Sequence, residues 1–160
     1  MAIQAGQRMP EGVFGVMTKS GPDKLTTDAL FAGKKVVLIS VPGAFTPTCS
    51  MNHLPGYLEL ADQLRAKGVD TIACMAVNDV FVMHAWGKDR AVGDKVVMLA
   101  DGNADYVRSL GLELDGTGFG MGIRGQRFAI VVDDGVATHV AVEAPAQFDV
   151  SSAESILEAL

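Results

Sequence analysis

Residues 36–41, Val-Val-Leu-Ile-Ser-Val, form a short apolar run that is rich in β-branched side chains. Two lysines precede this run, and Pro42 and Gly43 follow it. An apolar run of this length between such boundaries is typical of a strand that is covered on both faces. We therefore expect this segment to form an interior strand of a sheet with helices packed on both sides.

A helix and a second strand follow the first strand. From Thr46 onward apolar residues recur at helical spacing, and the pattern stops at Gly68. Residues 69–75 then resemble the first strand in composition. We expect this strand-helix-strand unit to have parallel strands and a right-handed crossover.

The rest of the chain continues this alternation. Asn78 and Asp79 can cap a helix that turns Phe81, Val82, Ala85 and Trp86 inward. The expected later elements are a strand over 95–100, a short helix over 103–111, a glycine-rich loop over 112–125, a β-hairpin over 127–142 and a final helix that begins with the capping box at 151–154. This order is that of a thioredoxin-like α/β fold, with a central mixed β-sheet flanked by helices. A length of 160 residues, 49% of them hydrophobic, suits a single domain over 1–160.

The charge and the hydropathy pattern exclude two classes of partner. Nineteen acidic and 13 basic residues give a net charge of −6 without long runs of one sign, which disfavours nucleic acid. No stretch approaches the ~20 apolar residues that cross a bilayer, and residues 1–12 lack the pattern of a signal peptide. We therefore expect a cytoplasmic protein with no membrane partner. No ligand cluster indicates a metal, and no motif indicates a cofactor.

The segment from Val41 to Ser50 carries the strongest chemical signal. In open parallel sheets ligands bind beyond the carboxyl ends of the strands, where this segment lies. If Thr46 caps the helix and Pro47 takes its first position, Cys49 falls in the first turn among unpaired N–H groups. That positive field favours a thiolate, although a cysteine near a helix start is also commonly a small buried apolar residue.

The motif Pro-Gly-Ala-Phe-Thr-Pro-Thr-Cys-Ser over 42–50, followed by His53-Leu-Pro-Gly56, closely resembles the peroxiredoxins. The resemblance is to their type II subfamily, which includes the atypical two-cysteine forms. It covers nearly the full length in four ordered blocks, at 34–57, 73–86, 98–103 and 122–135.

This resemblance implies a role for four residues. Cys49 matches the cysteine whose thiolate attacks hydrogen peroxide or an alkyl hydroperoxide and becomes a sulfenic acid. Thr46 matches the hydroxyl that bonds sulfur and peroxide, and Pro42 matches the residue that shields the pocket. Arg127 matches the arginine that stabilises the thiolate and orients the peroxide. We favour Arg127 over Arg124, whose alternative is a peripheral ion pair.

Other residues are expected around this pocket. His53 lies four positions after Cys49, on the same helical face, and we expect it to orient or support rather than to act as a base. Phe119, in the glycine-rich loop, is expected at the pocket rim or against a partner subunit, because the resembled subfamily forms homodimers through that face. The Gly-x-Gly-x-x-Gly at 120–125 precedes a strand and opens no helix, so it does not indicate a nucleotide site.

The step that restores Cys49 is the least determined by the sequence. Cys74 is a candidate resolving cysteine, but its position inside an apolar strand also suits a core thiol. The region 148–152, where some relatives carry a resolving cysteine, has none. We therefore expect an external reductant, either glutathione with glutaredoxin or thioredoxin. A peroxide-sensing protein and a thiol-disulfide oxidoreductase remain alternatives; the latter would need a second cysteine close to Cys49.

Overall fold

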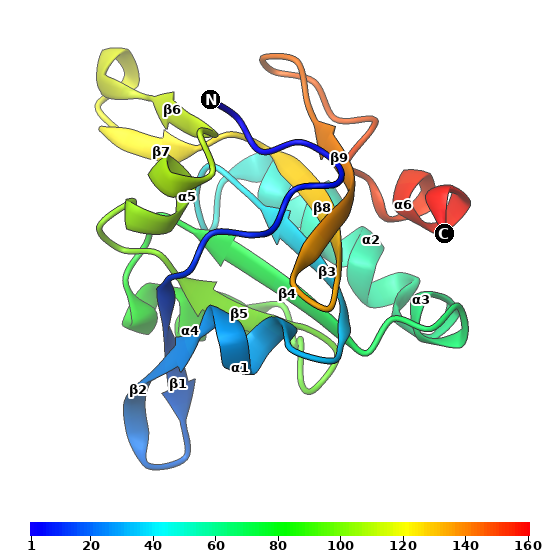
Figure 1. The fold of residues 1–160 in the computed structure, drawn as a ribbon. Helices are drawn as coiled ribbons and strands as arrows, with labels where there is room; N and C mark the ends of the chain where they lie inside the picture. Colours follow the sequence, from blue (N-terminus) through cyan, green and yellow to red (C-terminus); the bar gives the residue numbers. More distant parts are fainter.

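The computed structural model describes residues 1–160 and is built on one seven-stranded mixed sheet (Figure 1). The strand order is β2-β1-β5-β4-β3-β8-β9. The strands are β1 (Val13–Thr18), β2 (Gly21–Thr26), β3 (Lys35–Ser40), β4 (Thr71–Ala76), β5 (Val97–Ala100), β8 (Phe128–Asp133) and β9 (Val136–Val142). A separate two-stranded ribbon joins β6 (Glu113–Asp115) and β7 (Ile123–Gly125).

The pairing directions confirm the predicted mixed sheet. Strands β3, β4 and β5 run parallel, with Ile39 opposite Cys74. Strand β8 pairs antiparallel with β3, and β9 pairs antiparallel with β8 as the second strand of the predicted hairpin. The N-terminal hairpin β1–β2 and the β6–β7 ribbon were not assigned as strands from the sequence.

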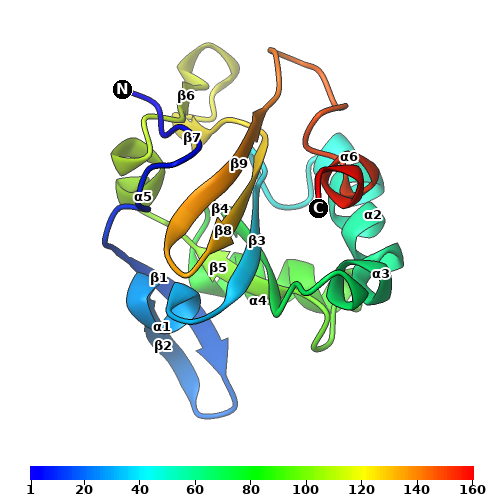
Figure 2. The same ribbon diagram turned by 45° about the vertical axis from the view of Figure 1, so that its right-hand side comes forward.

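Helices cover both faces of the sheet (Figures 1 and 2). They are α1 (Thr27–Phe31), α2 (Leu54–Glu59), α3 (Ala61–Ala66), α4 (Val80–Asp89), α5 (Asp105–Ser109) and α6 (Ala153–Ala159), with a π-helix η1 at Cys49–His53 and a 3₁₀ turn η2 at Thr117–Phe119. Helices α2, α3, α4 and α6 pack on one face, and α1 and α5 on the other. No helix combines the length and apolar character needed to cross a bilayer.

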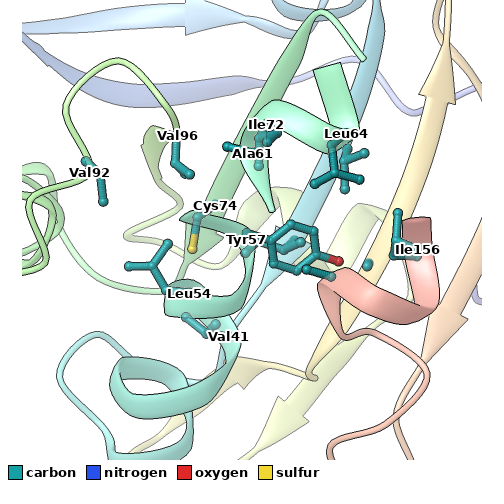
Figure 3. Close-up of a cluster of buried hydrophobic side chains, with 14 of the residues drawn as sticks. Val41, Leu54, Tyr57, Ala61, Leu64, Ile72, Cys74, Val92, Val96 and Ile156 are labelled. Atoms are coloured by element: carbon teal, nitrogen blue, oxygen red, sulfur yellow. The ribbon is translucent and has the colours of Figure 1, made fainter. Parts of the chain in front are cut away.

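The alternation of side chains along β3 creates two cores. Val37, Ile39 and Val41 join the cluster beneath α2, α3 and α6, whereas Val36 and Leu38 face the opposite cluster. Figure 3 shows the first cluster, in which Cys74 of β4 lies with Leu54 and Tyr57 of α2. Because both faces are covered, the interior of β3 from Val36 to Ile39 is a continuous apolar run, as its sequence predicts.

The helix expected between Thr46 and Gly68 is divided. Helical geometry begins at Pro47, widens to a π-turn over Cys49–His53, and breaks again at Leu60 between α2 and α3. The π-turn is closed by the Leu54 N–H, which donates to the Cys49 carbonyl five residues back. Pro55 follows directly; it has no N–H for the carbonyl four residues back, and its ring would crowd that carbonyl in a regular helix.

Three details of the later helices differ from the expectation. Helix α6 is capped by Ser152, whose Oγ accepts from the Ser155 N–H, so the capping box expected at 151–154 was wrong.

Helix α4 is turned differently from the prediction. In α4 the buried residues are Met83, Trp86 and Gly87, while Phe81 is 64% exposed and Ala85 is also exposed. The prediction of an inward Phe81 and Ala85 was therefore wrong, because the helix is rotated to seat Met83 and Trp86.

The short helix α5 begins at Asp105 rather than at Asn103. Its first N–H groups are bonded by the buried carboxylate of Asp101, which accepts from Tyr106 N at 3.0 Å and Val107 N at 2.9 Å. The capping group therefore lies before the predicted start, at the end of β5.

Candidate active site

The loop after β3 forms the rim of the site. The Thr46 hydroxyl donates to the Gly43 carbonyl at 2.7 Å, and the Ala44 N–H donates to Asn78 Oδ1 at 2.9 Å. Thr46 therefore does not cap the helix with its side chain as expected. Its only hydroxyl proton is committed to Gly43, so its oxygen is left to accept a hydrogen bond from an incoming group. Pro42 and Thr46 are both half-buried.

Cys49 lies beneath this rim, with no exposed surface, at the start of the π-helix. Arg127 Nη2 donates to its Sγ at 3.1 Å. The two residues are 78 positions apart in sequence. The sheet register brings them together, because Ser40 pairs with Phe128 in the antiparallel pair β3–β8. The loop that follows Ser40 and the residue Arg127 that precedes Phe128 therefore lie at the same end of the sheet. A permanent positive charge at this distance favours an anionic sulfur.

The second amino group of Arg127 fixes His53. Nη1 lies 3.0 Å from Nδ1 of the imidazole, while Nε2 lies 3.1 Å from the Ser151 carbonyl oxygen. A carbonyl only accepts and a guanidinium only donates. The hydrogen-bond partners therefore assign the proton to Nε2 and the free lone pair to Nδ1.

The same surroundings keep His53 neutral. Burial, and after it the positive charge of Arg127, lower the pKa of His53 from 6.5 to about 3, against smaller opposing effects of the Ser151 hydrogen bond and Glu143. A neutral imidazole with an occupied Nδ1 lone pair cannot take a proton from Cys49. The orienting role of His53 stays a prediction, and this hydrogen bonding leaves no free lone pair for a role as base.

Arg124 lies near Pro42 rather than near the sulfur. Its Nε donates to the Met121 carbonyl at 2.9 Å, and Nη1 is 3.5 Å from the Pro42 carbonyl. It forms no salt bridge, since the single ion pair of the chain joins Arg90 and Asp89. Arg124 therefore ties the glycine-rich loop to the rim of the site, and the ion pair considered from the sequence is absent.

The π-helix is anchored to α4 as well. The buried Trp86 Nε1 donates to Ser50 Oγ at 2.8 Å, and Arg90 Nη1 donates to the Ser50 carbonyl at 3.2 Å. The ring of Trp86 also lies 6.5 Å from that of Phe45, whose backbone has a φ of 65°. A phenylalanine in that left-handed region is strained, so this turn is held by its surroundings.

Neither Cys74 nor Phe119 forms a hydrogen bond with the Cys49 sulfur, which is bonded by Arg127. Cys74 is a free thiol with no exposed surface in β4, and burial raises the pKa of this thiol. Phe119 is 87% exposed in η2. It therefore contributes no contact to Cys49 within this chain.

Sequence reasoning missed three residues behind the site. Tyr57 donates from its hydroxyl to the Ser151 carbonyl at 2.7 Å, and Ser151 is in turn held by the carboxylate of Glu143. An acidic residue just after the alternating strand β9 carries no local signal of such a role. Only the return of the C-terminal segment over His53 brings these groups together.

Comparisons with known proteins bear on the family and the fold of the chain. A family model described as Redoxin matches residues 4–157. Peroxiredoxin-2B of Arabidopsis thaliana is 48% identical over 161 residues, covering 99% of this chain and 98% of that protein. Reduced Prx3 of Vibrio vulnificus, solved in complex with hydrogen peroxide, has a TM-score of 0.95 at 55% identity and covers 98% of both chains.

A putative thioredoxin reductase of Burkholderia cenocepacia also has this fold, with a TM-score of 0.97 at 47% identity, covering 100% of this chain and 99% of that one. The family match spans nearly the whole chain, and Peroxiredoxin-2B of Arabidopsis thaliana and Peroxiredoxin-2C of Oryza sativa subsp. japonica each match over 98% of their own length. The chain therefore belongs to the redoxin family, in which it is a type II peroxiredoxin, an enzyme that reduces peroxides with a thiol.

Proposed function

We propose that Cys49 is the peroxide-reducing cysteine and that Arg127, Thr46 and Pro42 are its partners in the reaction. The observation that carries this proposal is the 3.1 Å hydrogen bond from Arg127 Nη2 to Cys49 Sγ. The same guanidinium can stabilise the sulfur anion and the charge that develops on the peroxide oxygens. The free lone pairs of Thr46 Oγ1 can accept the peroxide O–H.

The first step follows from these positions. The Cys49 thiolate attacks one peroxide oxygen, a sulfur–oxygen bond forms, and the oxygen–oxygen bond breaks. The leaving hydroxide or alkoxide takes up a proton and departs as water or alcohol. Cys49 is left as a sulfenic acid, two electrons more oxidised than the thiolate.

A mass measurement tests this assignment. Reduced protein with one equivalent of hydrogen peroxide is expected to gain one oxygen on Cys49, and Cys49→Ser is expected to show neither that gain nor peroxide turnover. Cys74→Ser serves as the matched control and should still gain the oxygen. Peroxidase turnover by Cys49→Ser would refute the proposal.

We propose further that an external thiol restores Cys49. Two external thiols, as glutathione with glutaredoxin or as a thioredoxin, reduce the sulfenic acid to the thiol and release water and a disulfide. The support is the setting of Cys74, which is fully buried in β4 with a pKa raised by burial and is therefore a poor internal nucleophile. Turnover is to be measured with each reductant. If Cys74→Ser loses turnover while its first oxidation stays fast, an internal disulfide replaces this scheme.

We propose also that the protein acts in the cytoplasm, which is a reducing compartment, and that it forms a homodimer. Both cysteines are free, as suits such a compartment. Phe45, Phe81 and Phe119 are 51%, 64% and 87% exposed, and exposed apolar side chains that gather in one patch mark interaction surfaces. The Ala44–Asn78 hydrogen bond brings the segment that carries Phe45 close to the segment that carries Phe81, near the rim of the site. Phe81→Glu is expected to shift sedimentation from dimer to monomer, whereas Phe81→Leu should leave the dimer intact.

A further inference from the structure

Glu143 is a buried carboxylate that the mechanism above does not use. It follows β9 and is 7% exposed. Its Oε2 accepts three hydrogen bonds, from Asp149 N at 2.8 Å, from Ser151 N at 2.8 Å and from Ser151 Oγ at 2.6 Å. The carboxylate forms no salt bridge. Its charge is thus held by donors of the C-terminal segment alone.

These bonds fix the one carbonyl that His53 needs. With its N–H and hydroxyl both bound to Glu143, Ser151 presents its carbonyl oxygen to His53 Nε2 at 3.1 Å and to the Tyr57 hydroxyl at 2.7 Å. If that carbonyl moved away, the Nε2 proton would lose its acceptor, and only the Arg127 contact would still favour this tautomer. The imidazole would then be held less firmly in the position that receives the guanidinium.

Glu143 also holds the other end of Arg127. Its backbone N–H donates to the Arg127 carbonyl at 3.0 Å, next to the paired residues Phe128 and Val142. These hydrogen bonds form a closed cycle. The Glu143 carboxylate binds Ser151, the Ser151 carbonyl binds His53, and His53 binds the guanidinium of Arg127. The Arg127 carbonyl then binds the backbone N–H of Glu143 and completes the cycle. The arginine is fixed at its backbone and at Nη1, while Nη2 stays free to donate to the Cys49 sulfur.

We propose that Glu143, acting through Ser151, is a positioning residue of the peroxidase reaction, because it fixes the His53 tautomer that aims Arg127 at Cys49. This inference rests on the proposed role of Arg127. Because the Glu143 carboxylate binds Ser151 rather than Arg127, it does not neutralise the positive charge of the guanidinium. That charge can therefore act on the sulfur. Substituting a residue that orients a reacting group indirectly commonly lowers the rate by one or two orders of magnitude.

The test compares Glu143→Gln with Glu158→Gln. Both substitutions remove one negative charge from the C-terminal region, but Glu158 is exposed in α6 and makes no side-chain hydrogen bond. The rate of the first oxidation can be followed by stopped-flow fluorescence of Trp86, the only tryptophan, whose indole is bonded beside Cys49. We expect Glu143→Gln to be slower by about tenfold or more and Glu158→Gln to match the parent protein.

A second measurement separates positioning from a purely structural role. Nitrogen-15 NMR of the His53 ring should show the Nε2–H tautomer in the parent protein and a mixture of tautomers in Glu143→Gln. Should Glu143→Gln fail to fold, Ser151→Ala, which loses only the hydroxyl bond and keeps the carbonyl, is expected to show the same changes in smaller measure.

The outcomes distinguish this inference from the function on which it rests. A normal rate in Arg127→Gln would overturn the role of Arg127 itself. A slow Arg127→Gln together with an unchanged rate and an unchanged His53 tautomer in the Glu143 and Ser151 variants would leave that role standing and refute the positioning role of Glu143.

Discussion

At the scale of single residues, the guanidinium of Arg127 serves two acceptors at once. Its Nη2 bonds Cys49 Sγ and its Nη1 bonds His53 Nδ1, at 3.1 and 3.0 Å. The planar fork holds both bonds in a fixed relation, so the position of the imidazole constrains the donor that reaches the sulfur. An ammonium group carries the same charge but lacks that fork.

This difference makes Arg127→Lys informative. We expect the second-order rate of Cys49 oxidation to fall by roughly 10²-fold, comparable to the loss of one preorganised donor to a developing anion. Arg124→Lys is the matched control, because Arg124 bonds backbone carbonyls rather than the sulfur. Stopped-flow kinetics measure both variants. Equal rates in the two would show that charge alone matters at position 127.

The buried neutral His53 makes stability depend on pH. Its pKa is lowered to about 3 by burial and by Arg127, below the ordinary 6.5. Below about pH 6.5 the imidazole of His53 binds a proton in the unfolded chain but not in the folded chain. The free energy of unfolding therefore decreases as the pH falls toward 3. The expected loss between pH 7 and about pH 4.5 is roughly 2.5 kcal/mol.

Chemical denaturation at several pH values measures this effect. His53→Asn removes the titrating ring and should flatten the acid side of the curve, while His84→Asn, at an exposed position, should not. Curves of the same slope for the parent and His53→Asn would assign the acid sensitivity to other groups. Glu143 is one such group: burial raises its pKa, but the hydrogen bonds from Ser151 and its neighbours outweigh burial and hold that pKa below 4.5, so its contribution is lost only below that value.

At the scale of elements, the π-helix of Cys49–His53 depends on helix α4 for its position. Its residue Ser50 is held by Trp86 through the side chain and by Arg90 through the backbone. A π-turn has poorer internal bonding than a regular helix, so contacts from neighbours decide where it lies. Helix α4 therefore helps to set the place of Cys49 without touching its sulfur.

A double-mutant cycle tests this anchor. Trp86→Phe keeps a large aromatic ring but loses the N–H, and Ser50→Ala loses the acceptor. Each substitution is expected to lower the free energy of unfolding by about 1 to 2 kcal/mol. Because both remove the same bond, the double variant should lose less than the sum, by about 1 kcal/mol. Simple additivity in urea denaturation would contradict a specific Trp86–Ser50 bond.

At the scale of the whole molecule, the two cysteines belong to parts of different expected stability. Cys74 lies in β4, the central strand of the seven, between parallel neighbours and beneath covered faces. Cys49 lies at the start of a short irregular helix near the sheet end. Local opening can expose such a helix, whereas a central strand opens only when the domain unfolds.

Thiol labelling distinguishes these two motions. In Cys49→Ser, where Cys74 is the only thiol, we expect alkylation to occur only through global unfolding and to accelerate with denaturant with the dependence of that unfolding. In Cys74→Ser, labelling of Cys49 should be faster and less sensitive to low denaturant. Rapid native-state labelling of Cys74 would mean that β4 opens locally and that pairing with Cys49 is within its reach.

Local patterns in the sequence accounted for much of this molecule. The apolar run after Lys35 determined a doubly covered strand, and the spacing from Pro42 to Cys49 pointed to the loop and helix start that form the rim of the site. These features depend on near neighbours in the chain, where side-chain periodicity, proline geometry and turn residues act directly. The Arg127–Cys49 pair was expected only through the family resemblance.

The tertiary structure decided the features that depend on distant segments. The register of β3 against β8 brings Arg127 to Cys49, and the return of the C-terminal segment brings Glu143 and Ser151 to His53. The rotation of α4 and the π-turn before Pro55 likewise follow from packing and from backbone bonds that no short pattern records. Hydrogen-bond partners that lie 78 or 98 residues away are determined by the fold as a whole, because only the assembled sheet and the elements packed on it bring them within bonding distance.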